Sequence, residues 1–246
     1  MDSPASVWSA FSAAFAQTNV PTVTWVEMLL SLAAAVALSI PRRSWRYFGL
    51  LATATHELGH AFAAVTSGQR LTGIRLRLDH SGTTTTYSRS RLAAAWSCFW
   101  GYPVPAMVGA AFVWCGLNGW GPAAMATSAL VLAASVVFLR NLAGFAITAA
   151  AIAGAAALGF LAPVSVVGHV AVVLGLALLV AGVRDLLKLT NVHLRRRDRL
   201  SSSDAYLLYR ATSIPSGIWI TLFTLIVTGA WLVAWQPISM ILLKGA

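Results

Sequence analysis

Two histidines and a glutamate lie within an otherwise apolar segment, LLATATHELGHAFAAVTSGQ (residues 50–69). His56 and His60 are four residues apart, which places their imidazoles on one face of a helix, one turn apart. Two imidazoles at this spacing can bind one zinc ion, and Glu57 beside the first can act as general base toward a water molecule. At this composition, two histidines four residues apart with an acidic residue directly after the first are expected by chance about 0.003 times. The motif therefore predicts a hydrolytic metal site with His56 and His60 as ligands and Glu57 as the base.

The composition indicates which kind of element must position these residues. Of 246 residues, 58% are hydrophobic and 10% are charged, and the mean hydropathy is +0.75. A soluble domain carries about 25% charged residues, and several apolar runs approach the ~20 residues needed to cross a bilayer. The sequence predicts an all-α, polytopic integral membrane protein. We attribute the net charge of +10 to membrane topology and expect no nucleic-acid partner.

The predicted chain is a single membrane domain over residues 1–246, with its core at 45–235. Seven crossings are expected, at 22–40, 45–66, 93–115, 121–139, 142–161, 165–187 and 216–241. With the N-terminus in the cytoplasm, 13 Lys and Arg residues fall inside and four outside, several of them in a basic loop at about 188–214. The C-terminus is then outside, and the HELGH motif lies about 15 Å along its crossing, toward the cytoplasmic side.

A change of period follows the motif. The segment LTGIRLRLDHSGTTTTY alternates apolar and polar residues, has a turn sequence at 79–82, and ends in residues of high β-propensity. It predicts a β-hairpin at about 71–88, with Asp79 and His80 as solvated turn residues. An extended substrate could add to the hairpin edge as a further strand, with Gly73 and Ile74 as candidate contacts. Asn141, between two predicted crossings, is a third candidate, with a helix cap as its alternative role.

On these residues the chain resembles the site-2-protease-like family of intramembrane zinc metalloproteases, in particular its smaller bacterial and plant branch. HELGHAFAAVTSG followed by TGIRLRLDHSGTTT is similar to the opening of that branch, where a HExxH helix leads into a short β-segment. GYPVPAMVGA (101–110) and SSSDAYLLYRATSIP (201–215) resemble later segments. The resemblance implies a bacterial plasma membrane location and a role in regulated intramembrane proteolysis. Better-studied members take the third zinc ligand from a Leu-Asp-Gly stretch, which this chain lacks.

Two aspartates remain as candidates for that third ligand among the seven acidic residues. Asp204 follows three serines and opens a predicted helix; the family resemblance favours it, so Asp204 is the predicted third ligand and Asp185 is the alternative. Asp185, at the end of a predicted crossing, is favoured by its placement in the membrane. The others are less suited by position: Asp2 is terminal, Glu27 lies toward the outer face, Asp79 is in the turn, and Asp198 is in an arginine run.

The expected function is hydrolysis of membrane-spanning or membrane-tethered protein or peptide substrates by an intramembrane zinc metalloendopeptidase with one Zn²⁺ per chain. The substrate and the lipid bilayer are the expected partners, and a regulatory membrane partner is left open. The alternative is a membrane protein that binds metal without proteolysis, as a transporter or a scaffold. A transporter should show further polar ligands on several crossings, and none is evident in the sequence.

Overall fold

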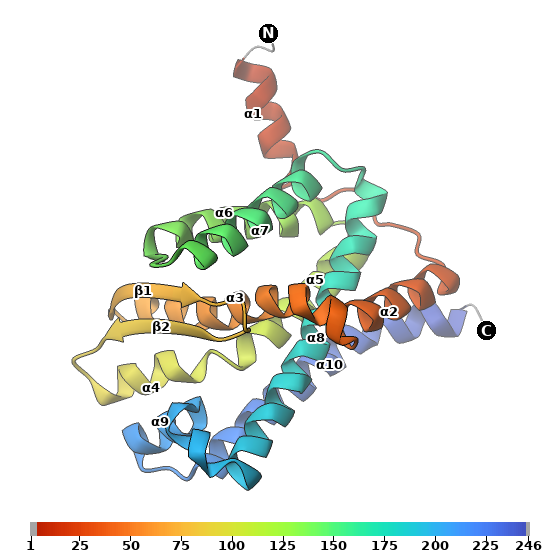
Figure 1. Ribbon diagram of the computed structural model, residues 1–246. Helices are drawn as coiled ribbons and strands as arrows, with labels where there is room; N and C mark the ends of the chain where they lie inside the picture. The colour runs from red at the N-terminus through yellow and green to blue at the C-terminus, as the bar shows by residue number, and fades with distance from the viewer. Residues whose placement is uncertain (1–3, 245–246) are drawn as a thin grey trace.

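The computed structural model describes the backbone of residues 4–244, with the side chains of 8–9, 11–196 and 200–243. Within this range the chain forms ten α-helices, two short 3₁₀ helices and two strands (Figure 1). Their bounds are α1 Pro4–Ala13, α2 Trp25–Ser39, α3 Arg42–Thr66, β1 Arg70–Leu76, β2 Gly82–Tyr87, α4 Arg91–Phe99, α5 Pro103–Leu117, α6 Gly121–Ser135, η1 Val136–Phe138, α7 Leu142–Phe160, α8 Val164–Arg195, η2 Arg197–Ser202, α9 Asp204–Thr212 and α10 Ser216–Lys244.

Four helical segments are long and apolar enough to cross a membrane, namely Gly121–Phe138, Leu142–Phe160, Val164–Arg195 and Ser216–Leu243. Two bent pairs raise the number to six if each pair is one span: α2 with α3, bent by 89°, and α4 with α5, bent by 45°. The expectation of an integral membrane protein that is mostly helical with a small sheet is therefore met. The described helices support four to six spans, and the predicted count of seven is not confirmed.

The difference in span count arises mainly at the corner between α2 and α3. Helix α2 has 15 residues, which span about 22 Å at 1.5 Å per residue and fall short of a ~30 Å hydrocarbon core. Pro41 is the N-cap of α3 with φ −66°, and because proline lacks an N–H and restricts the residue before it, the helix breaks there. If α2 and α3 form one broken or re-entrant segment, the predicted sidedness of the termini changes; orientation stays a prediction.

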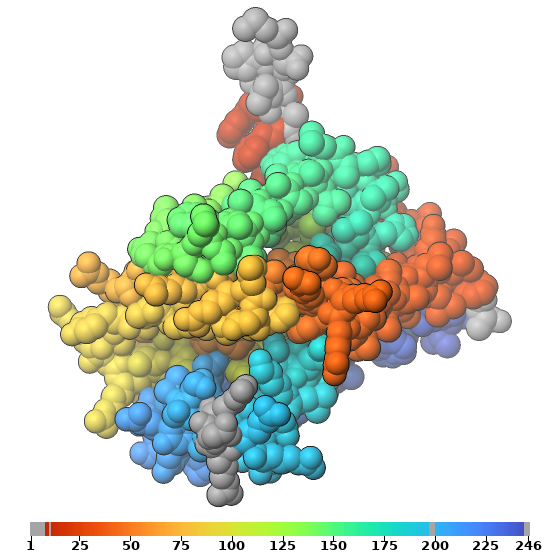
Figure 2. Space-filling model, viewed as in Figure 1, coloured from red at the N-terminus to blue at the C-terminus, as the bar shows by residue number. Residues whose placement is uncertain are grey.

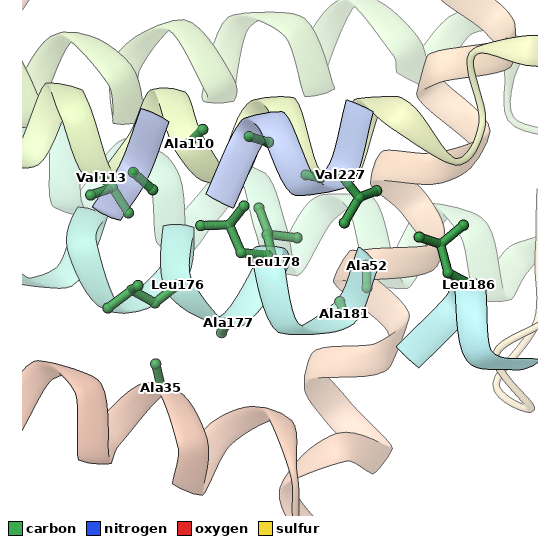
Figure 3. Close-up of a cluster of buried hydrophobic side chains, with 14 of the residues drawn as sticks. Ala35, Ala52, Ala110, Val113, Leu176, Ala177, Leu178, Ala181, Leu186 and Val227 are labelled. Atoms are coloured by element: carbon green, nitrogen blue, oxygen red, sulfur yellow. The ribbon is translucent and has the colours of Figure 1, made fainter. Parts of the chain in front are cut away.

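Helix α8 is the centre of the helical core. It lies among α2, α5 and α10, and Leu176, Leu178 and Ala181 on α8 face the packed interior together with Val113 of α5 and Val227 of α10 (Figure 3). Helix α5 approaches α8 closely because small residues face each other. A Cβ on Gly109 would lie 2.6 Å from the Gly175 carbonyl oxygen, and a Cβ on Gly116 would lie 2.5 Å from that of Gly168. Small residues at such contacts are typical of helix packing in membranes.

Strands β1 and β2 pair antiparallel as the predicted hairpin. In the turn, the Asp79 carboxylate accepts hydrogen bonds from the hydroxyl and the main-chain N–H of Ser81, which lower the pKa of Asp79. Ile74 and Leu76 are buried with residues of α3 such as Ala54. The pairing of β1 with β2 and the burial against α3 fix the hairpin beside the HELGH helix.

The second edge of β1 is occupied by the chain around Leu139, which forms a parallel bridge with Ile74. The Arg140 N–H donates to the Ile74 carbonyl oxygen at 3.0 Å. The Asn141 amide donates to the Leu76 carbonyl oxygen at 2.6 Å and accepts from the Leu76 N–H at 3.2 Å. A substrate strand therefore finds this edge already paired.

Candidate active site

Three donor atoms converge between α3 and α9. His60 Nε2 lies 3.1 Å from His56 Nε2, and Asp204 Oδ2 lies 3.3 Å from each of these nitrogens. Among the described residues, these three form the group of His, Cys, Asp or Glu side chains whose donor atoms are close enough to share a metal ion. Bonds of about 2.0–2.1 Å in a tetrahedral zinc site place neighbouring donors about 3.3–3.4 Å apart. Donor types and spacings therefore fit a zinc ion with a fourth position left open.

The two histidines are oriented by contacts outside their own helix. His60 Nδ1 lies 2.8 Å from the Ser97 carbonyl oxygen on α4. When Nδ1 carries the proton and donates it in this hydrogen bond, Nε2 keeps its lone pair for a metal ion. The His56 ring packs edge-on against Tyr102, with centroids 4.9 Å apart, and Tyr102 stacks on Phe223 of α10 at 5.1 Å. The imidazoles are therefore held by α4, by the α4–α5 corner and by α10.

Asp204 is placed by the short helix that it begins. The preceding residue, Ser203, is the N-cap of α9, and its hydroxyl accepts a hydrogen bond from the Tyr206 N–H at 3.2 Å. Ala205 and Leu208 are fully buried in the main hydrophobic core. Burial raises the pKa of Asp204, but the neighbouring histidines lower it more, so that its net pKa lies below the ordinary value. The carboxylate is therefore ionised at neutral pH, as a metal ligand must be.

Glu57 is 6% exposed and lies under strand β2. The Thr84 hydroxyl donates to Glu57 Oε2 at 2.6 Å and lies 3.1 Å from the Glu57 main-chain oxygen. Gly82 covers the carboxylate so closely that a Cβ there would lie 2.4 Å from Oε1. Strand β2 therefore determines the position of the predicted base.

Gly101 closes the other side of the site. A Cβ at this position would lie 2.4 Å from His60 Nε2 and 2.6 Å from His56 Nε2. Because Gly101 has no side chain, space remains beside the two histidine nitrogens. Gly101 and Thr84 lie in segments that resemble the family, but their contacts with the motif arise through tertiary packing, so neither was predicted as a site residue.

A cavity of about 850 Å³ is lined by the three donor residues and Glu57. Its walls come from the hairpin, α4, the end of α8 and α9, and Figure 2 shows a recess between the yellow hairpin surface and the blue surface of α9. Thr83, Thr84 and Thr86 of β2 line it, so a substrate backbone could reach β2 from the cavity. Asp185 also lines the cavity but is not among the converging donors, so the geometry favours Asp204.

The residues predicted as substrate contacts lie elsewhere. Gly73, Ile74 and Asn141 are not among the residues that line the cavity. Ile74 is 2% exposed, and the Asn141 side chain is bonded to Leu76 at the paired edge of β1. Asn141 is the N-cap residue of α7, although its side chain makes no capping bond.

The remaining acidic and turn residues also have defined positions. Asp79 and His80 lie in the hairpin turn at the cavity rim, and His80 Nε2 is 3.1 Å from the Arg46 carbonyl oxygen. Glu27 forms a capping box with Thr24 at the start of α2. Asp2 and the Asp198 side chain lie outside the described residues.

The family comparison agrees with this geometry. A family model described as Peptidase M50B-like matches residues 29–234, and the chain belongs to this peptidase family. The predicted relationship to the site-2-protease family is thereby confirmed. Comparisons with curated proteins and with solved structures give no match.

Proposed function

We propose that this chain is an intramembrane zinc metalloendopeptidase that hydrolyses peptide bonds of membrane-spanning or membrane-tethered proteins. The observation that carries the proposal is the convergence of His56, His60 and Asp204 at zinc-ligand spacing beside the buried Glu57. Membership of the peptidase family and the long apolar helices support the same reading.

In the proposed mechanism, His56, His60 and Asp204 hold the metal. A bound zinc ion supplies Lewis acidity, which polarises a carbonyl and lowers the pKa of water to about 7. Glu57 removes a proton from the attacking water and delivers it to the leaving amine. The Thr84 hydroxyl, 2.6 Å from Oε2, fixes one oxygen of the Glu57 carboxylate that moves this proton.

The substrate is proposed to bind in extended form against β2. The threonines of β2 line the cavity, whereas the second edge of β1 is paired with the chain at 139–141. Main-chain hydrogen bonds to a strand edge hold a peptide without dependence on its sequence. This arrangement requires the substrate to be unwound locally before it is cut.

A metal transporter is the less favoured function. Transport needs ligands along a path through several crossings, and the part of the chain that the structure describes shows a single group of converging metal-binding side chains. A catalytically silent scaffold would retain the same fold and is tested by activity.

The test compares wild type, Glu57→Gln and His56→Ala expressed in cells that lack the natural protein. Zinc per purified chain is measured by elemental analysis, and new N-termini in membrane proteins are measured by terminal peptide profiling. We expect wild type to hold about one zinc and to generate new termini, Glu57→Gln to keep zinc without generating them, and His56→Ala to lose both. Identical terminal profiles for wild type and Glu57→Gln would contradict the protease assignment and favour the scaffold.

A further inference from the structure

The third donor of the site is carried by an element unlike the other two. His56 and His60 belong to the 25-residue helix α3, whereas Asp204 is the first residue of the nine-residue helix α9. Helix α9 is outside every candidate membrane span and follows the 3₁₀ segment η2. The position of Asp204 therefore depends on what holds the first turn of α9.

One side chain from α8 reaches that turn. His193, in the last turn of α8, has its Nε2 2.8 Å from the Ser203 hydroxyl oxygen. Ser203 is 9% exposed, and the same hydroxyl accepts the capping bond from Tyr206. This pair connects the long core helix directly to the residue before Asp204.

Other contacts that hold the start of α9 are the Cys98 thiol and buried apolar side chains. Besides the hydrogen bonds within α9, the Asp204 main-chain oxygen accepts a hydrogen bond from the Cys98 thiol of α4, with 3.6 Å between sulfur and oxygen. Ala205 and Leu208 anchor α9 by apolar burial, which is not directional. The hydrogen bond between His193 and Ser203 is directional, and it can therefore fix the orientation of the first turn of α9, which apolar packing alone does not.

We propose that His193 is a positioning residue for the metal site, acting through Ser203 to hold the Asp204 carboxylate against the two imidazoles. The proposal rests on the proposed zinc site. Ser203 and Asp204 share a peptide bond, so a displaced Ser203 moves Asp204 with it. Metal–donor distances tolerate about 0.2 Å, and loss of the partners that orient ligands lowers metal affinity about 10–100-fold.

The experiment measures zinc affinity by chelator competition in the purified full-length chain. We expect His193→Ala to weaken binding about 10–100-fold and His193→Gln, which keeps a polar group near Nε2, to restore affinity to within about threefold. His169→Ala is the matched control on the same helix, since His169 Nδ1 bonds the Ser165 carbonyl oxygen within α8, and it should bind zinc as wild type does. Absorption spectra of the Co²⁺-loaded protein report whether the site geometry changes.

A double-mutant cycle separates positioning from general destabilisation. If His193 acts through Ser203, adding His193→Ala to Ser203→Ala should weaken zinc binding no further, whereas independent effects would add. Thermal unfolding of the metal-free variants reports any loss of fold. Wild-type zinc affinity and Co²⁺ spectrum in His193→Ala, no rescue by Gln, or additive effects would overturn the proposal.

The outcome for Asp204→Ala distinguishes failure of this proposal from failure of the proposed function. Weak zinc binding in Asp204→Ala together with normal binding in His193→Ala rejects the role of His193 alone. Normal binding in Asp204→Ala, or no zinc in folded wild type, rejects the metal site and the His193 role with it.

Discussion

Substitution of Gly101 by alanine should dismantle the metal site by adding a single methyl group. The added Cβ would lie 2.4 Å from His60 Nε2 and 2.6 Å from His56 Nε2, whereas ordinary contacts begin at 3.4 Å. Both rings must therefore retreat by about 1 Å, since carbon contacts are optimal at about 3.5–4.0 Å. This displacement is several times the ~0.2 Å that metal–donor distances tolerate.

We expect Gly101→Ala to lower zinc affinity at least 100-fold, which corresponds to about 2.7 kcal/mol. The assay is competition between the detergent-purified protein and a fluorescent zinc chelator. Gly154→Ala and Gly229→Ala are matched controls, because a Cβ at either position meets nothing within 4 Å. Both controls should bind zinc as wild type does.

A second glycine gives a contrasting result on the same site. A Cβ on Gly82 would have its three nearest atoms in the Glu57 side chain, with Oε1 at 2.4 Å. Gly82→Ala should therefore keep its zinc and lose cleavage. If thermal unfolding shows that the Gly101→Ala protein is folded and it still binds zinc with wild-type affinity, the expected displacement of the two histidine rings is refuted.

Three further substitutions test the supports of the site. Thr84→Val removes the hydrogen bond to Glu57 and should lower the cleavage rate about tenfold without changing zinc content. Thr84→Ser keeps the hydroxyl and should keep the wild-type cleavage rate and zinc content. Equal cleavage rates for the two variants would argue against a role of the hydroxyl. Arg184→Met removes donors to the last carbonyls of α2 and a cation–π contact. It should destabilise the fold by about 2–3 kcal/mol, seen as a lower unfolding temperature in detergent that Arg184→Lys partly restores. Asn141→Ala frees the main chain of Leu76 and should speed hydrogen exchange in the hairpin, and unchanged exchange there would contradict the bridging role.

The HELGH helix and the hairpin were predictable because their signals are local. The His56–His60 spacing needs only helical periodicity, and the hairpin needs only alternation and a turn sequence. The structure confirms the hairpin and places Glu57 under it. These features depend on residues that are neighbours in the chain.

Asp204 was predicted as the third donor through the family resemblance, with Asp185 kept as the alternative, because the choice between the two carboxylates depends on packing. Asp185 and Asp204 both end up at the same cavity, and their local sequences do not tell which carboxylate faces the imidazoles. That outcome follows from the burial of Ala205 and Leu208, which seats α9 against the core. Such contacts join segments about 100 residues apart.

The span count and the substrate contacts differed for similar reasons. Hydropathy treats residues 22–40 and 45–66 as two crossings, although Pro41 allows an 89° corner between the helices. Asn141 is polar and lies between apolar helices, which is typical of a functional residue. Its amide instead completes the main-chain pairing of Leu76, a role that only the tertiary structure reveals.

Zinc content of the purified chain is the most direct test of the central claim. Wild type is compared with His56→Ala, Asp204→Ala and Asp185→Ala by elemental analysis after gel filtration in detergent. The proposed site predicts about one zinc per wild-type chain, loss of it in His56→Ala and Asp204→Ala, and retention in Asp185→Ala. Folded wild type without zinc after zinc is supplied, or zinc kept by Asp204→Ala and lost by Asp185→Ala, would contradict it.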